Sequence, residues 1–215
     1  MVVSSHPSIC AKLSPWAAGL LAVTLSLAVG VSGCKKGHES TNQALYKSGM
    51  WSETIQQLQD LDVSESEVND LITVHIAGFS DNGCVALIKI LRGRKQMFTE
   101  GTPIGDLLRA GVSEATVLEL AQLDQIGPWT GEAQGIRLSG YSDQVVLAIA
   151  RRRTQHLPTV SGPSLVQLKN IGVDESQALD LIARGLTDEQ AGQKIAAHQA
   201  TEMPRGFVRG GKKKR

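Results

Sequence analysis

The stretch Gly111-Val112-Ser113-Glu114 lies between two apolar segments and has the composition of a junction between two helices. Glycine can adopt the left-handed conformation that ends a helix. A serine two places later can accept a hydrogen bond from the free amides of the next helix, and an acid at the first helical position is favoured by the helix dipole. The stretch therefore predicts that one helix ends near residue 111 and another begins at residue 114.

Close variants of this junction occur five more times, beginning at Asp62, Gly78, Gly140, Gly172 and Gly185. In each copy the apolar residue before the cap is followed five places later by a second apolar residue, which is the spacing of a hydrophobic staple. Three copies also carry a Glu or Gln at the third helical position, where it can complete a capping box. These residues are Glu67, Gln177 and Gln190.

The chain from residue 51 onward predicts an all-α fold. The full 215-residue chain is 41% hydrophobic and only 4% aromatic, which suits the packing of aliphatic helices. Leu58, Leu107 and Leu168 each stand four residues before a junction, so the apolar period recurs in register. We expect a helical repeat domain over 51–201, built as a tandem array of three units of about three short helices each, at 52–98, 102–157 and 161–200. The middle unit has a wider junction spacing and should carry an extra helix and turn within 121–138.

Residues 1–33 contain no acid and include an apolar run from Trp16 to Val31, which leads into Val31-Ser32-Gly33-Cys34. This segment resembles a bacterial lipoprotein signal peptide. The resemblance implies cleavage before Cys34, attachment of lipid such as palmitate to the Cys34 thiol, and export to a membrane-anchored position. Lys35 follows the cysteine in place of the Asp that is associated with inner-membrane retention, which favours the outer membrane if the cell has one. The alternative is an uncleaved membrane anchor with an incidental cysteine.

Two segments without an apolar period flank the expected array. Residues 34–50 predict a flexible tether. Residues 202–215 predict a basic flexible tail that has no acid after residue 202. Such a tail can bind anionic lipid, another anionic polymer or DNA by charge alone. The alternative is a tail that simply remains solvated. Its cations are Arg205, Arg209, Lys212, Lys213, Lys214 and Arg215.

Cys84 is the one cysteine that remains once the signal segment is removed and Cys34 is acylated. An intramolecular disulfide is then excluded. Cys84 occupies the staple position that holds Val or Ala in other junctions. We therefore expect a small buried residue rather than a reactive thiol.

The stretch from Leu123 to Thr130, LDQIGPWT, resembles the hairpin of helix-hairpin-helix proteins, which include DNA glycosylases and membrane-anchored DNA-uptake receptors. The resemblance implies that backbone amides near Gly127 bind a DNA phosphate, with Trp129 and Thr130 beside them. The stretch departs from the family pattern because Gln125 replaces the first hairpin glycine. The alternative is an ordinary Gly-Pro turn with Trp129 packed on its own unit.

No motif in the sequence predicts an enzyme, a metal site or a cofactor. The histidines are widely separated, no nucleophile is paired with a base, and the junction acids are explained by helix capping. The cations near Arg92 and Arg151 stand at predicted helix ends, where they can complement the helix dipole or form a nucleic-acid patch. The sequence thus predicts a membrane-anchored lipoprotein that acts as a non-enzymatic helical scaffold or binding protein for an envelope protein partner. The alternative is an envelope-tethered DNA-binding protein of helix-hairpin-helix type.

Overall fold

The predicted all-α fold is confirmed by the structure, a computed structural model that describes residues 40–127 and 129–202. In this part of the chain every regular element is a helix, beginning with a helical segment at residues 40–47. Cys34, the rest of the predicted signal segment and the predicted basic tail beyond residue 202 lie outside the described residues. The labelled helices are α2 (Ser52–Asp60), α3 (Glu65–Ile76), α4 (Asp81–Gly93), α5 (Gly101–Arg109), α6 (Glu114–Gln122), α7 (Thr130–Leu138), α8 (Asp143–Thr154), α9 (Gly162–Asn170), α10 (Glu175–Ala183) and α11 (Asp188–Glu202).

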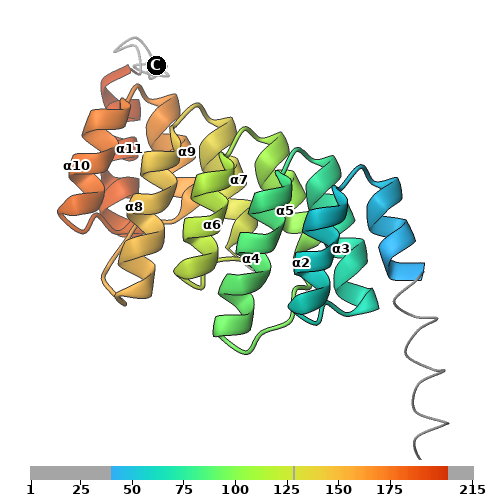
Figure 1. Ribbon diagram of the computed structural model, residues 1–215. Coiled ribbons are helices and arrows are strands. Elements are labelled where there is room, and N and C mark those ends of the chain that lie inside the picture. The colour runs from blue at the N-terminus through green and yellow to red at the C-terminus, as the bar shows by residue number, and fades with distance from the viewer. Residues whose placement is uncertain (1–39, 128, 203–215) are drawn as a thin grey trace, which may run out of the picture. The chain divides into compact units, whose positions relative to one another are not determined.

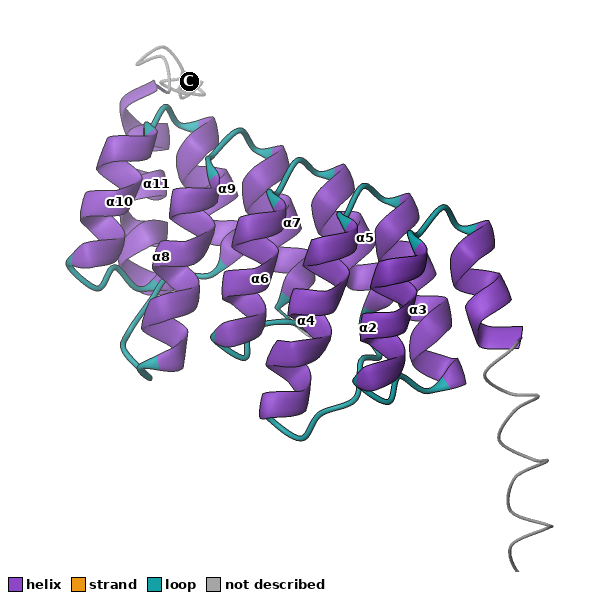
Figure 2. Ribbon diagram, in the orientation of Figure 1, coloured by secondary structure: helices purple, strands orange, loops and turns teal. Residues whose placement is uncertain are grey.

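The helices alternate between two layers. The even-numbered helices form one layer and the odd-numbered helices the other, and each helix packs against the helix two places along the chain, α3 on α5, α5 on α7 and so on (Figure 1). Short turns at the upper edge join each odd helix to the next even one, and the connections return at the lower edge (Figure 2). Three of the lower connections, at 94–100, 123–129 and 155–161, have the same length. The repeating element is therefore a pair of antiparallel helices, as in other solenoids.

This packing corrects the predicted grouping into three units of three helices at 52–98, 102–157 and 161–200. Helix α7 lies inside the segment 121–138 that was expected to be an insertion, yet it packs between α5 and α9 in its layer. The sequence pattern missed this because the starts of α5, α7 and α9 lack the Gly-apolar-Ser-acid junction. The pattern therefore marked the turn within each of the pairs α5–α6, α7–α8 and α9–α10, but not the start of the pair.

All six junctions have the backbone that the sequence predicts. Each first residue has a positive φ, including Asp62 at 53° and Gly111 at 86°. The capping side chain accepts a hydrogen bond from a first-turn amide in every copy, and the three expected capping boxes form at Ser64, Asp174 and Thr187. The twelve residues of the predicted staples are buried, except Val173, which is half-buried.

The predicted tether at 34–50 extends too far into the folded part. Residues 40–47 are helical, and the side chains of Leu45 and Met50 are buried in the hydrophobic core. Gly49 ends this helix with a φ of 95°, and the amide of Met50 donates to the carbonyl of Leu45, as at a helix C-cap. The sequence pattern did not predict this helix because few apolar residues of the segment, namely Ala44, Leu45 and Met50, contact the core.

Cys84 lies in the core, as expected of a staple residue. Burial, together with the nearby carboxylates of Asp81 and Glu114, raises the pKa of its thiol to about 12. A thiol with this pKa is protonated at neutral pH and is therefore a poor nucleophile.

Candidate functional site

The Gly127 hairpin is closed by its own hydrogen bonds. Gly127 has a φ of 115°, and its amide donates to Oγ1 of Thr130 at 2.9 Å, while the amide of Thr130 donates to the carbonyl of Gly127 at 3.0 Å. Thr130 is buried. The carboxylate of Glu100 lies beside Gly127 as well, 3.6 Å from the position that a Cβ would take. A phosphate at this amide would have to displace Thr130 and approach a negative charge.

Trp129 packs against the array instead of offering a stacking surface. Only 4% of the residue is exposed, its Nε1 has no hydrogen-bond acceptor among the residues that the structure describes, and the guanidinium carbon of Arg153 lies 5.4 Å from the ring centroid. The hairpin geometry thus matches an ordinary turn more closely than a phosphate-binding loop.

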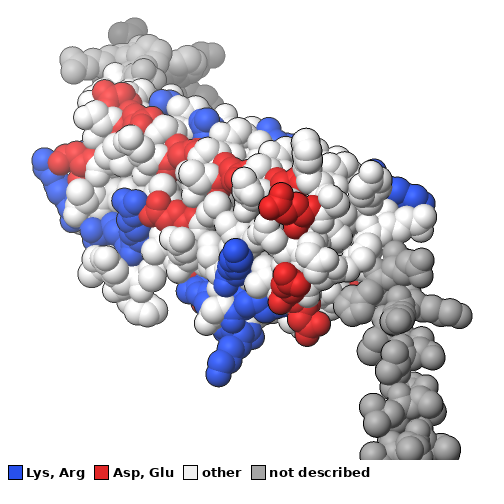
Figure 3. Space-filling view, in the orientation of Figure 1, with Lys and Arg blue, Asp and Glu red and all other residues white. Residues whose placement is uncertain are grey.

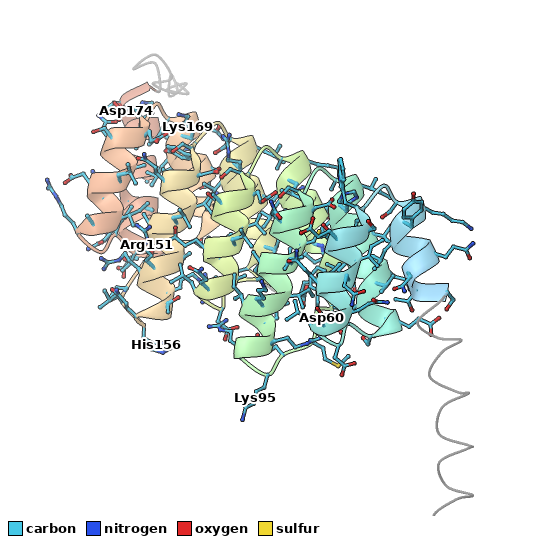
Figure 4. All side chains as sticks on the ribbon, in the orientation of Figure 1. Asp60, Lys95, Arg151, His156, Lys169 and Asp174 are labelled. Atoms are coloured by element: carbon cyan, nitrogen blue, oxygen red, sulfur yellow. The ribbon has the colours of Figure 1, made fainter. Side chains whose placement is uncertain are left out.

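The arginines near the helix ends are engaged by backbone carbonyls of other helices. Arg92 donates to the carbonyls of Leu61 and Asp62 at the end of α2, both at 3.1 Å, and Arg94 donates to Ala121 at 3.0 Å. Arg152 reaches Ala183 near the end of α10 in the same way, at 3.1 Å. These contacts satisfy carbonyls that a helix leaves free at its C-terminus, where positive charge is favoured. Figure 4 shows Lys95 and His156 projecting at the lower ends of α4 and α8.

The acid that opens each even helix binds the preceding even helix. Glu114 accepts hydrogen bonds from the amide of Ser80 at 2.7 Å and from its hydroxyl at 2.8 Å. Asp143 and Glu175 accept from the amides of Ser113 and Ser142 at 2.9 and 3.1 Å. Acidic side chains follow one another across the upper part of the molecule in Figure 3, and these residues lie at that edge of the array. The row of acids therefore joins successive repeats through hydrogen bonds.

Asp143 of this row and Glu67 are held ionised by their hydrogen bonds. Burial alone would raise the pKa of Asp143, but hydrogen bonds from Ser113 and Thr116 and the charge of Arg137 outweigh it and lower the pKa. Burial likewise opposes ionisation of Glu67, yet hydrogen bonds from Arg92, the Phe98 amide and Ser64 bring its pKa down to about 2. Both carboxylates therefore act as fixed negative charges near neutral pH.

A hollow of about 280 Å³ lies between the α4–α5 and α6–α7 connections. Its walls are mainly apolar and include Leu91, Phe98 and Ile126, while Arg94 and Asp124 form an ion pair of 2.7 Å beside them. Met97 also lines the hollow, and 58% of this residue is exposed. Sequence analysis did not identify this site because its residues come from two connections whose pairing depends on the layered packing.

A second candidate surface lies at the N-terminal end of the array. Tyr46 and Trp51 line one shallow depression, and 68% and 77% of these residues are exposed. The sequence signal was Gly49-Met50-Trp51-Ser52, which follows the first half of the junction pattern. It was overlooked because it lacks the capping serine and the acid.

Comparison of the chain with protein-family models, curated proteins and solved structures found no match. In residues 40–127 and 129–202, no group of three or more His, Cys, Asp or Glu side chains is arranged to hold a metal ion. No helix in the same ranges has the length and hydropathy needed to cross a membrane.

Proposed function

We propose that the chain is an exported, lipid-anchored protein that acts as a non-enzymatic helical scaffold and binds a protein partner at the bacterial cell envelope. The anchor is proposed from the Val31-Ser32-Gly33-Cys34 sequence. The scaffold role is supported by the two-layer array, because each layer adds one helix per repeat to an extended surface of the kind that solenoids use for binding.

The observation that carries the binding role is the hollow beside Met97. Apolar walls with one polar rim can receive an apolar side chain of a partner, and a methionine adapts to irregular surfaces. An exposed Met97 at this rim would lose apolar area on binding. The charged groups of the array support a non-enzymatic role, since they serve contacts between helices.

The anchor is tested by metabolic labelling with a fatty acid. Cys34→Ser should remove the label and leave an unprocessed precursor, whereas Cys10→Ser, in the segment that is cleaved off, should leave the labelled mature protein unchanged. Equal labelling of Cys34→Ser and the parent chain would exclude Cys34 as the lipid attachment site.

The binding role is tested by cross-linking and capture from solubilised envelope. A partner held in the hollow should be captured by the parent protein and lost with Met97→Glu, which places a charge on the apolar rim. Leu157→Glu is the matched control, because Leu157 is also an exposed apolar residue on a lower connection but does not line the hollow. A partner that both variants capture equally would show that it binds elsewhere.

A further inference from the structure

The turn Gly49-Met50-Trp51-Ser52, which precedes the six junctions in the chain, differs from them in what it exposes. Gly49 has the positive φ and Met50 the burial that the pattern requires. The cap position, however, holds Trp51, which makes no side-chain cap hydrogen bond, and Ser52 replaces the acid. The Trp51 amide donates to Asp81 at 2.9 Å, as the Ser80 amide donates to Glu114 in the next repeat. The exposed indole of Trp51 therefore takes no part in capping α2.

The surroundings of Trp51 have the composition of a membrane-interface contact. Tyr46 shares its depression, and Lys47 is exposed next to Tyr46 in the chain. Tyrosine and tryptophan favour the headgroup region of a bilayer, because their rings are apolar and each carries one polar group. Glu53 is also exposed in the first turn of α2 and offsets the charge of Lys47. Attraction at this surface should therefore depend on the rings more than on charge.

The chain length places this surface within reach of the proposed lipid. Ser40, where the described part begins, is six residues after Cys34. Six extended residues span at most about 20 Å, and the helical rise from Ser40 to Tyr46 adds about 9 Å. A bilayer that holds a lipid on Cys34 is consequently close to the N-terminal end of the array, and no other exposed tryptophan occurs in the described part of the chain.

We infer that Tyr46 and Trp51 dock in the headgroup region of the bilayer that anchors the chain. This inference rests on the proposed lipid anchor, and its occupant is the lipid surface itself. Docking would fix the N-terminal end of the array at the membrane and leave the hollow beside Met97 available to a partner.

Tryptophan fluorescence tests the contact directly. The mature full chain is reconstituted in phosphatidylethanolamine–phosphatidylglycerol vesicles, and Trp129→Phe leaves Trp51 as the only tryptophan after Cys34. We expect nitroxide lipids labelled near the headgroup to reduce Trp51 emission at least twofold, with weaker quenching by deeply labelled lipids and little change in 1 M NaCl. The control is Trp51→Phe, whose remaining Trp129 is buried and should not be quenched.

The mass of the reconstituted protein separates the two proposals. A missing lipid mass would refute the proposed anchor, whereas quenching reports on docking whether or not the lipid is present. Trp51 emission that nitroxide lipids leave unchanged, in a protein with native helical circular dichroism, would overturn the docking inference. Quenching that 1 M NaCl abolishes would also overturn it, because a charge-dominated contact would then be responsible.

Discussion

Gly111 illustrates how a single backbone conformation supports the array. Its φ of 86° lies in the region that side-chain-bearing residues rarely adopt, while a Cβ would meet only the flexible end of Arg137 at 3.6 Å. Gly111→Val should therefore lower the free energy of unfolding by about 1 kcal/mol or more through backbone strain alone. Thermal and urea unfolding measure the change.

Gly135→Ala is the matched control for Gly111→Val. Gly135 lies inside α7 with open space around it, so alanine should raise stability by up to about 1 kcal/mol. If both substitutions shift the unfolding midpoint in the same direction, the positive φ at residue 111 is not what ends α5.

Because of Glu67, the free energy of unfolding should fall as the pH is lowered. The pKa of Glu67 falls from 4.5 to about 2 on folding, so its contribution is fully present above about pH 4.5 and is lost as pH drops toward 2. The difference corresponds to about 3 kcal/mol. Unfolding free energies measured between pH 6 and 2.5 should fall steeply for the parent protein and less steeply for Glu67→Gln. Parallel profiles for the two proteins would mean that Glu67 does not carry this dependence.

At the scale of elements, capping chemistry was predictable and the partners of the capping residues were not. The positive φ of the first residue and the side-chain cap involve residues within one turn, and sequence analysis located both positions at all six junctions. The acid that follows was interpreted as a local response to the helix dipole. In the structure, Glu114 instead accepts from Ser80, 34 residues earlier, and a contact of this kind depends on which helices become neighbours.

The last two cap amides of the described array are satisfied within their own junctions. In the layer of even-numbered helices, the amides of the caps Ser80, Ser113 and Ser142 are satisfied by the acid that opens the next even helix. Asp174 and Thr187 have no later repeat within the described residues, and their amides donate to their own Gln177 and Gln190 at 3.1 Å. Capping boxes thus satisfy these two amides without a further helix pair, as the box at Ser64 does inside the array.

Close approach of neighbouring helices gives a test at this scale. The amide of Gly162 donates to Glu132 at 2.8 Å, and a Cβ on Gly162 would lie 2.8 Å from Cβ and 3.0 Å from the carbonyl oxygen of Glu132. Gly162→Ala should force α9 away from α7 and cost about 1–3 kcal/mol of unfolding free energy. Gly131→Ala, where no atom interferes, should not destabilise the protein. Equal stability of the two variants in urea would contradict the tight α7–α9 packing.

For the whole molecule, the hairpin shows why local resemblance was insufficient to assign a site. The amino-acid sequence around Gly127 suggested a phosphate contact. In the structure, the Thr130 side chain and the Glu100 carboxylate occupy the space around the Gly127 amide. Glu100 comes from the preceding lower connection, and its approach follows from the layering. The hollow beside Met97 and the exposed Trp51 depend on the same arrangement, so neither could be assigned from residue spacing.

For the DNA-binding alternative, an experiment can distinguish binding by the Gly127 hairpin from binding by the basic tail. Because the Gly127 amide is already satisfied, we expect any binding of the mature chain to random duplex DNA to come from the six cations after residue 204. Six charges give a slope of log affinity against log salt of at most about −5, so binding should be weak at physiological salt. A salt titration by fluorescence anisotropy measures both the affinity and the slope.

Replacing the six tail cations by Gln in the full mature chain should abolish that binding, whereas Thr130→Val should leave it unchanged. Thr130→Val removes the hydroxyl that accepts a hydrogen bond from the Gly127 amide, and it keeps the shape of the side chain. If the amide were a latent phosphate ligand, this variant would bind DNA more tightly than the parent, even with the tail cations removed. Micromolar binding by a chain without tail cations, lost on Gly127→Val, would therefore identify the hairpin as a DNA site after all.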